Sequence, residues 1–214
     1  MALLTILIPS RYRFDRLVSC IDSYVNLASD KKNVEFIIKF DTDDLESFSR
    51  INEIRKDINI KYLVTDRLNG YNSLHEYANY MYKLATGTWI MFCTDDAKIL
   101  TKDWDLVLDK QPYELVCLCP KEGGKVSEVF PIINTEACKM FNMFCANHAQ
   151  DRWFNQIYRD ADRMRIIDIE FEHHILNDKS NEDRRQNNVP DNWDETKVLR
   201  DYQTNILKHD TRAI

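Results

Sequence analysis

The segment Trp89–Asp96, WIMFCTDD, is an apolar run that ends abruptly in two adjacent carboxylates. A turn signal, Thr86-Gly87, precedes it, and an apolar run bounded in this way is typical of a strand buried on both faces of a sheet. Carboxylates at the carboxyl end of such a strand lie where open α/β sheets bind their ligands. Two anionic oxygen donors there form a seat for a hard divalent cation, which can in turn hold a substrate diphosphate. The alternative is a pair of solvated aspartates in a turn, and the rest of the chain decides between the two.

The composition describes a globular chain with an acidic balance. Its 214 residues are 44% hydrophobic and carry a net charge of −6, which suits one domain with a full core. The acidic balance argues against a sequence-independent nucleic-acid binder, which needs a basic face. No apolar run approaches the roughly 18 residues of a membrane span. The apolar start, 2–8, is too short for a signal peptide and lacks the preceding basic region. We therefore expect a soluble cytoplasmic protein with no nucleic-acid partner and no integral membrane segment.

Cysteine and glycine usage limits the chemistry further. None of the six cysteines forms a CxxC, and most lie inside apolar segments, which favours buried free thiols in a reducing compartment. There are only four glycines, and neither a GxGxxG nor a Walker motif occurs. A nucleotide bound by this chain must therefore be held by a metal and by side chains.

The first 96 residues alternate between apolar runs and helical stripes. Strands are expected over 3–8, 34–40 and 61–65 and in the run that ends at Asp96, with amphipathic helices between them over 14–28, 45–54 and 74–85. This alternation predicts a mostly parallel sheet. Acidic clusters end the second, third and fourth strands, whereas carboxylates scattered at random would also fall at strand starts.

Beyond Asp96 the pattern loosens. A short helix is expected around Trp104, a turn at Gly123-Gly124, and strands over 114–119, 129–133 and 165–171. A helix over 153–161 precedes the last of these strands. Residues 177–195 are polar and rich in Asn and Asp, which indicates a long loop or flap, and 196–208 form a closing helix.

The ordered set of motifs resembles the GT-A-type glycosyltransferases, closest to the inverting family-2-like members, over roughly residues 3–175. The matching elements are Pro9-Ser10-Arg11, Asp41-Thr42-Asp43, Arg67-Leu68-Asn69-Gly70, Ala85-Thr86-Gly87, Thr94-Asp95-Asp96, Trp104-Asp105, Asp151 and Glu172-His173-His174. The resemblance implies a Rossmann-like α/β fold with a mostly parallel central sheet, flanked by helices, and a smaller mixed region. It divides one domain, 1–214, into a nucleotide-binding half (1–96), an acceptor-side half (97–175), and a polar flap with a C-terminal helix (176–214).

The resemblance places a nucleotide across the carboxyl ends of the first strands. Its predicted contacts come from Pro9, Ser10, Arg11, Asp41, Asp43, Arg67 and Asp95. The first turn offers backbone groups and a cationic donor, and a carboxylate there accepts from a base edge or a ribose hydroxyl. Two plainer interpretations stay open: helix capping by Asp43 or Asp44, and a surface ion pair between Arg67 and Asp66.

The resemblance also implies a metal site. Asp96 is the predicted direct ligand, Asp95 touches ribose or a metal-bound water, and His173 or His174 completes the shell. Carboxylate, imidazole and phosphate ligands suit Mn²⁺ at least as well as Mg²⁺. Adjacent residues on an extended chain point to opposite faces, so the sequence does not say which histidine binds. Thr94 stands where the family often carries another carboxylate, which leaves the division of roles between the two aspartates open.

Asp151 is the predicted general base, because sugar transfer with inversion needs a carboxylate on the acceptor side. Its alternative role is an N-capping aspartate. Trp104 and Trp153 fit core packing better than stacking on a sugar.

The implied activity is metal-dependent transfer of a sugar, with inversion, from a nucleotide-diphosphate sugar (a UDP-sugar by default) to an unidentified acceptor hydroxyl, glycan or other. One alternative is a sugar-phosphate nucleotidyltransferase, although such enzymes normally carry a glycine-rich first loop. Another is a catalytically inactive module that binds nucleotides or glycans.

Overall fold

Four parallel strands form the first half of the sheet. The computed structural model of the chain describes residues 1–112, 114–173 and 193–210. Its first strands are β1 (Leu4–Pro9), β2 (Val34–Asp41), β3 (Asn59–Thr65) and β4 (Trp89–Phe92), in the spatial order β3-β2-β1-β4. The helices between them are α1 (Phe14–Leu27), α2 (Leu45–Ser49) and α3 (Leu74–Met81), supplemented by short 3₁₀ turns. The predicted alternation over the first 96 residues is confirmed.

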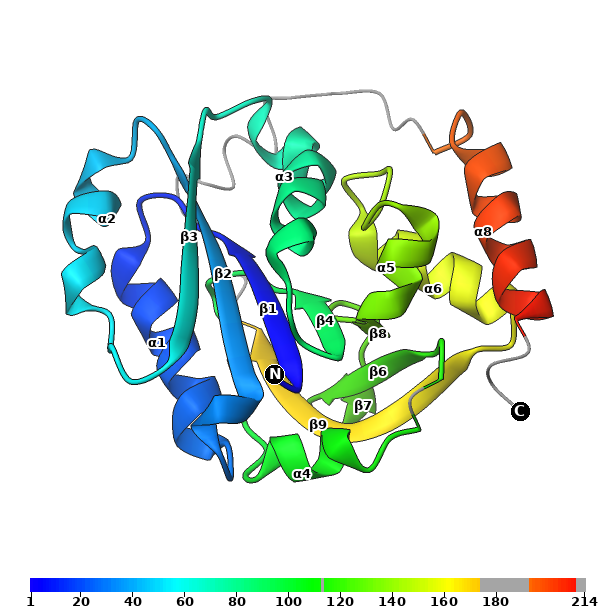
Figure 1. Cartoon of the computed structure of the whole chain (residues 1–214), viewed down its shortest axis with the longest axis horizontal. Coiled ribbons are helices and arrows are strands. Elements are labelled where there is room, and N and C mark those ends of the chain that lie inside the picture. The colour runs from blue at the N-terminus through cyan, green and yellow to red at the C-terminus, as the bar shows by residue number, and fades with distance from the viewer. Residues whose placement is uncertain (113, 174–192, 211–214) are drawn as a thin grey trace.

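The second half of the sheet is mixed, as expected. Beyond β4 the order continues through β8 (Ile132–Asn134), β6 (Cys117–Glu122), β9 (Met164–His173) and β5 (Ala97–Ile99), and β7 (Lys125–Val126) pairs with β6. Of the strand pairs described in this half, only β6 with β9 is parallel. Figure 1 shows β9 as a long curved strand that sweeps back toward β1 and β4. Its last residue, His173, pairs with Ala97, the residue after Asp96.

Among the described residues, four further helices belong to this half: α4 (Trp104–Asp109), α5 (Thr135–Phe141), α6 (Gln150–Asp160) and α8 (Lys197–His209). The prediction missed α5 and the short strands β5 and β7. The strand expected over 129–133 begins only at Ile132, after Pro131, which has no backbone N–H to donate to a ladder. Pro120 lies inside β6 where the pairing with β9 shifts register, the position at which a sheet tolerates proline. Most of the expected flap, 177–192, lies outside the described residues.

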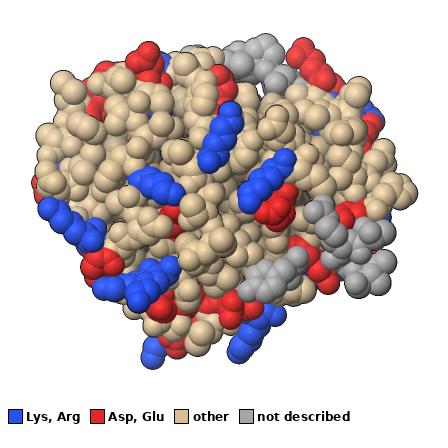
Figure 2. All heavy atoms as spheres, viewed as in Figure 1, with Lys and Arg blue, Asp and Glu red and all other residues tan. Residues whose placement is uncertain are grey.

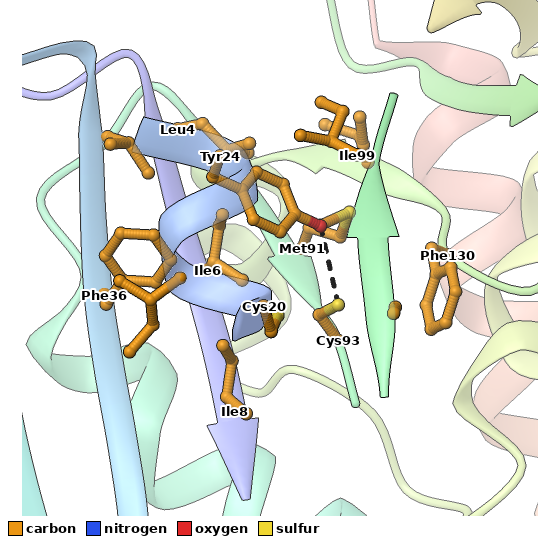
Figure 3. Packing of buried hydrophobic residues seen from close by; sticks show 14 of the residues in the cluster. Leu4, Ile6, Ile8, Cys20, Tyr24, Phe36, Met91, Cys93, Ile99 and Phe130 are labelled. Carbon is orange, nitrogen blue, oxygen red and sulfur yellow. Dashed lines mark hydrogen bonds between the residues drawn. The ribbon is translucent and has the colours of Figure 1, made fainter. Parts of the chain in front are cut away.

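The core lies on both faces of the parallel strands. Side chains of β1 alternate, with Ile6 and Ile8 packed under α1 and Leu7 on the face covered by α3 and α6. Figure 3 shows the α1 face, where the Tyr24 hydroxyl lies 3.5 Å from Cys93 Sγ. Trp104 and Trp153 are fully buried, which confirms core packing for both. All six cysteines are buried free thiols, as predicted.

A carboxylate closes the amino end of the parallel strands. Glu35, the second residue of β2, is fully buried. It accepts hydrogen bonds from Thr5 Oγ1 (2.6 Å), Lys61 Nζ (2.6 Å), Thr86 N (2.8 Å), Thr86 Oγ1 (3.0 Å) and Asn59 Nδ2 (3.2 Å). Gly87 follows this cluster, and a Cβ there would lie 2.7 Å from Thr5 N, closer than packed atoms allow. Glycine is therefore required for the close approach of this turn to β1.

The surface carries both signs of charge. Figure 2 shows Lys and Arg interspersed with Asp and Glu on the viewed face, without a single-sign field. Among the described residues, no helix combines the length and apolar character that a membrane span requires.

Candidate active site

A cleft of about 290 Å³ opens at the carboxyl ends of β1, β2 and β4. Its polar lining comes from the loop after β1, the end of β2, the loop before α3, the end of β4, the start of α6 and the end of β9. The polar and charged residues used below are Ser10, Arg11, Arg13, Lys39, Asp41, Arg67, Tyr77, Thr94, Asp96, His148, Gln150, Asp151 and His173. Ligands of open α/β sheets bind at this edge.

The turn after β1 presents two arginines to this cleft. Tyr12 lies between them in the left-handed region, with φ of 53°, a conformation that non-glycine residues seldom adopt outside constrained sites. Its backbone N–H donates to Asp44 Oδ2 at 2.8 Å, which fixes the turn against the start of α2. As a result, Arg11 reaches carboxylates after β2, and Arg13 reaches carboxylates after β4.

The Arg11 side of the cleft is a dense ion-pair cluster at the end of β2. Arg11 Nη1 donates to Asp41 Oδ2 at 2.8 Å, and Arg11 Nη2 donates to Asp43 Oδ2 at 2.8 Å. The bond with Asp43 is the main cause of a raised Arg11 pKa, and Arg11 lowers the pKa of Asp43 in return. Lys39 pairs with the other oxygen of Asp41, and its ammonium lies 3.8 Å from the centre of the Tyr77 ring. Burial lowers the Lys39 pKa, and Asp41 opposes that effect.

The Arg13 side of the cleft holds the two aspartates that follow β4. Arg13 Nη2 lies 2.8 Å from Asp95 Oδ1, and Arg13 Nη1 lies 3.6 Å from Asp96 Oδ2. Ser10 Oγ donates to Asp95 Oδ2 at 2.7 Å. Burial raises the pKa of Asp95 to about 6, against the opposing effects of Arg13 and Ser10. Burial also acts on Asp96, but His173, Thr94 and Arg13 outweigh it and bring the Asp96 pKa to about 2.

His173 is the histidine that faces Asp96. Its Nε2 lies 3.5 Å from Asp96 Oδ1, and its ring packs edge-on against Phe130 at 5.1 Å. Asp96 Oδ1 is buried and has no hydrogen-bond partner among the described residues. This oxygen and the nearby His173 Nε2 can therefore both coordinate one metal ion. These two donors fit a divalent cation. No third His, Cys, Asp or Glu joins them among residues 1–112, 114–173 and 193–210, and the predicted ligand His174 lies outside these ranges. A cation bound here would therefore take its other ligands from phosphate oxygens and water.

Asp151 enters the cleft from the first turn of α6. The alternative N-cap assignment is wrong, because Ala149 occupies the N-cap and Asp151 is the second helical residue. Asn147 Oδ1 accepts from Ala149 N at 2.8 Å and so shapes the helix start. Asp151 Oδ1 accepts only a local bond from Arg152 N, at 2.8 Å, among the hydrogen bonds resolved for it. The neighbouring Gln150 lines the same wall, with its Oε1 buried and unpartnered within the described part of the chain.

Comparison with known proteins rests on structure alone. No family model matches the sequence, and no curated protein matches it. S. aureus TarS 1-349 in complex with UDP-GlcNAc superposes with a TM-score of 0.69 at 14% identity, over 94% of this chain and 66% of that chain. The mannosyltransferase PcManGT from Pyrobaculum calidifontis, in complex with GDP-Man and Mn²⁺, gives 0.62 at 12% identity, over 95% and 69%. The glycosyltransferase GlyE of Streptococcus pneumoniae gives 0.51 at 9% identity, over 78% and 45%.

These superpositions establish the architecture. The chain has the GT-A glycosyltransferase fold. It spans 60% of the TarS 1-349 chain in the first of the matched structures.

On this GT-A sheet, most of the residues singled out from sequence line one cleft. They are Pro9, Ser10, Arg11, Asp41, Arg67, Asp96, Asp151 and His173. Asp43 and Asp95 do not line it; each instead pairs with an arginine that does. Asp44, rather than Asp43, caps α2 by accepting from Ser47 N at 3.1 Å, which confirms one of the two capping interpretations. Gly70, with φ of +55°, leaves room for Arg67, since a Cβ there would lie 3.2 Å from Arg67 Nη2.

Several residues of the GT-A cleft were not singled out from the sequence, among them Arg13, Lys39, Tyr77 and Gln150. The sequence could have indicated Lys39 as a site residue. It is a lysine inside an apolar strand, and it lies two residues before Asp41, so both side chains are on the same face of the strand. Arg13 is the second cation of the first loop, but only the left-handed Tyr12 turns it toward Asp95. Nothing in the pattern distinguishes Tyr77 from a core residue or Gln150 from an ordinary helix residue.

Proposed function

We propose that this protein is a glycosyltransferase that moves a sugar, with inversion, from a nucleotide-diphosphate sugar to an acceptor hydroxyl. The observation that supports this most is the meeting of two chemically different groups in one cleft. A cation seat, Asp96 with His173, and an uncommitted carboxylate, Asp151, both line it. A metal-dependent transfer with inversion uses both, the cation for the leaving group and the carboxylate for the acceptor.

The reaction follows from these positions. The acceptor oxygen attacks the anomeric carbon while the bond from that carbon to the diphosphate oxygen breaks. The electron pair of the broken bond leaves with the nucleoside diphosphate, and the acceptor proton passes to Asp151. Asp151 is suited to this step because it lines the cleft without a partner cation among its resolved contacts.

The seat at Asp96 and His173 would hold Mn²⁺ or Mg²⁺. A divalent cation bound there supplies charge stabilisation for the departing diphosphate, so that no protein acid is needed on that side. Arg67 lines the same cleft and would bring a further positive charge toward the phosphates.

The nucleoside belongs at the end of β2. Asp41 is held there between Arg11 and Lys39, and the buried Tyr77 hydroxyl has no hydrogen-bond partner among the described residues. A base or ribose placed against this cluster meets fixed donors and acceptors. UDP is the default nucleotide by family resemblance; the matched structures carry UDP-GlcNAc in TarS and GDP-Man with Mn²⁺ in PcManGT.

The test uses the purified 214-residue chain with UDP-, GDP- and dTDP-sugars, each with and without Mn²⁺. Thermal stabilisation reports binding, and release of the nucleoside diphosphate reports hydrolysis or transfer. We expect one nucleotide class to stabilise the protein in a Mn²⁺-dependent way and to be turned over slowly by water. No response to any donor refutes the transferase. Release of inorganic pyrophosphate from a nucleoside triphosphate and a sugar phosphate would instead identify a nucleotidyltransferase. Binding without turnover on any acceptor identifies an inactive binding module.

Replacement of the proposed ligand sharpens the metal assignment. Asp96→Ala should bind the donor nucleotide with the same weak affinity whether or not Mn²⁺ is present, because its cation seat is lost. His148→Ala is the matched control, since His148 lines the cleft but lies against Tyr71, at 5.6 Å between ring centres. A Mn²⁺ dependence unchanged in Asp96→Ala would exclude this residue as the ligand.

A further inference from the structure

Arg13 occupies the position of a competing cation at the proposed metal seat. Its guanidinium spans Asp95 and Asp96, with one nitrogen 2.8 Å from the first carboxylate and another 3.6 Å from the second. The side chain of Asp95 has no solvent exposure, and that of Asp96 only 13%. Two carboxylates this buried and adjacent in sequence repel each other unless a cation lies between them.

The bond pattern distinguishes the two aspartates. Both oxygens of Asp95 are in contact with a polar group: Ser10 Oγ donates to one, and Arg13 Nη2 lies 2.8 Å from the other. Asp96 is engaged more loosely, because Arg13 Nη1 lies 3.6 Å from its Oδ2 and His173 Nε2 lies 3.5 Å from its Oδ1. The guanidinium is thus anchored at Asp95 and can give up Asp96 without losing its stronger partner. Arg13 Nε, buried and likewise unpartnered, retains donor capacity toward a ligand.

We infer that Arg13 is an exchangeable counter-ion: it neutralises Asp96 until a divalent cation binds there, and it then donates to the diphosphate of the donor. This inference rests on the proposed function and adds a positioning residue to it. It makes binding of metal and of diphosphate mutually dependent. A metal ion at Asp96 frees Arg13 to bind the diphosphate, and a diphosphate bound to Arg13 frees Asp96 to bind the metal ion. Arg13 lines the cleft and is 21% exposed, so its guanidinium has room to shift.

The neighbouring arginine gives a matched contrast. Arg11 lies in the same turn and lines the same cleft, but its carboxylates are Asp41 and Asp43 at the end of β2. Removing either arginine lowers the net charge of the cleft by the same amount. Only the loss of Arg13 removes a cation that competes for the metal ligand Asp96.

The experiment measures Mn²⁺ affinity without nucleotide, by titration calorimetry and by the loss of the free Mn²⁺ paramagnetic resonance signal. Arg13→Gln should bind Mn²⁺ roughly tenfold more tightly than wild type, since a positive charge within a few ångströms of the site is lost. Arg13→Lys, which keeps a charge but cannot span two carboxylates, should fall between the two. Arg11→Gln should match wild type. If Arg13→Gln is too unstable for titration, Arg13→Lys against Arg11→Lys makes the same comparison.

A second measurement tests the diphosphate contact. At saturating Mn²⁺, Arg13→Gln should bind UDP about tenfold more weakly than wild type, while its affinity for uridine, which has no phosphate, stays unchanged. Mn²⁺ affinity equal to or weaker than wild type in Arg13→Gln overturns the inference, as does an equal loss for UDP and uridine. Wild-type protein that binds neither Mn²⁺ nor any nucleoside diphosphate overturns the proposed function itself. Wild-type binding of both, with unaltered variants, overturns only the role of Arg13.

Discussion

The two ends of the parallel strands hold buried carboxylates in different ways. At the amino end, Glu35 accepts five hydrogen bonds, four of them from neutral groups fixed by the fold. At the carboxyl end, Asp95 and Asp96 face a partly exposed arginine, Arg13, and one Asp96 oxygen has no hydrogen-bond partner among the described residues. A carboxylate satisfied by fixed donors stabilises the fold, whereas one balanced by a long cationic side chain stays available to a ligand.

The largest expected effect tests the catalytic end. Asp151→Asn should lower kcat about 10³-fold, because the amide cannot accept the acceptor proton. Donor affinity measured by titration should stay within about threefold of wild type, since Asp151 acts on the other substrate. Asp160→Asn, at the far end of α6, is the control and should retain activity. Loss of donor binding in Asp151→Asn would show that the base has been assigned to the wrong residue.

The next effect tests the structural end. Glu35→Gln should lower the free energy of unfolding by about 3 kcal/mol, because a buried amide cannot accept from all five donors and leaves Lys61 without its carboxylate. Glu136→Gln, which removes an exposed pair with Lys139, should change it by less than about 0.5 kcal/mol. Denaturant unfolding of the three proteins measures both values. Equal stability of the two variants would remove the distinction drawn between the ends of the strands.

The pH dependence of stability gives a second test of the role of Glu35. The pKa of Glu35 is lowered in the fold, because the bonds from Lys61, Thr5 and Thr86 outweigh the opposing effect of burial. Its contribution is therefore fully present above the unfolded pKa of about 4.3 and is lost as the pH falls through the folded value. The stability gap between wild type and Glu35→Gln should narrow as the pH is lowered from 7 to 3. A gap that stays constant over this range would contradict the lowered pKa.

The smallest effect concerns the exposed partner of Arg11. Asp43→Asn should leave the free energy of unfolding nearly unchanged, because the Asp43 side chain is 56% exposed and Arg11 keeps Asp41. Asp41→Asn, which removes the buried partner of both Arg11 and Lys39, should cost more. Urea unfolding of the two variants compares them directly, and the reverse order would show that Asp43 is the structural member of the pair.

Sequence reasoning worked well where one physical signal repeats. The strands and helices up to β4 were predictable because apolar runs and helical stripes alternate, and the carboxylates after β2 and β4 then had to lie along one edge. The rule that acidic residues mark strand ends missed Glu35, which lies at a strand start. Its five donors come from three other segments, and their convergence is a property of the assembled sheet.

The remaining gaps have local causes. Whether His173 or His174 faces Asp96 depends on the pairing of β9 with β5, and the three-residue strand β5 is too short to carry a periodic signal. The orientation of Arg13 depends on the left-handed backbone conformation of Tyr12, which the sequence does not predict. Asp105 matched a family motif, yet the structure shows it accepting from Ser29 and Asn33, a structural bond set like that of Glu35.

The central place of β1 sets a length for the ligand. Because β1 pairs with β2 on one side and β4 on the other, the two carboxylate pairs are two strand spacings apart, about 10 Å. A molecule that touches both must reach across this width. An inorganic phosphate or a monosaccharide is too short, whereas a nucleoside joined to two phosphates spans it. For the proposed nucleotide-sugar donor, the strand spacing thus sets the minimum length of a molecule that contacts both carboxylate pairs.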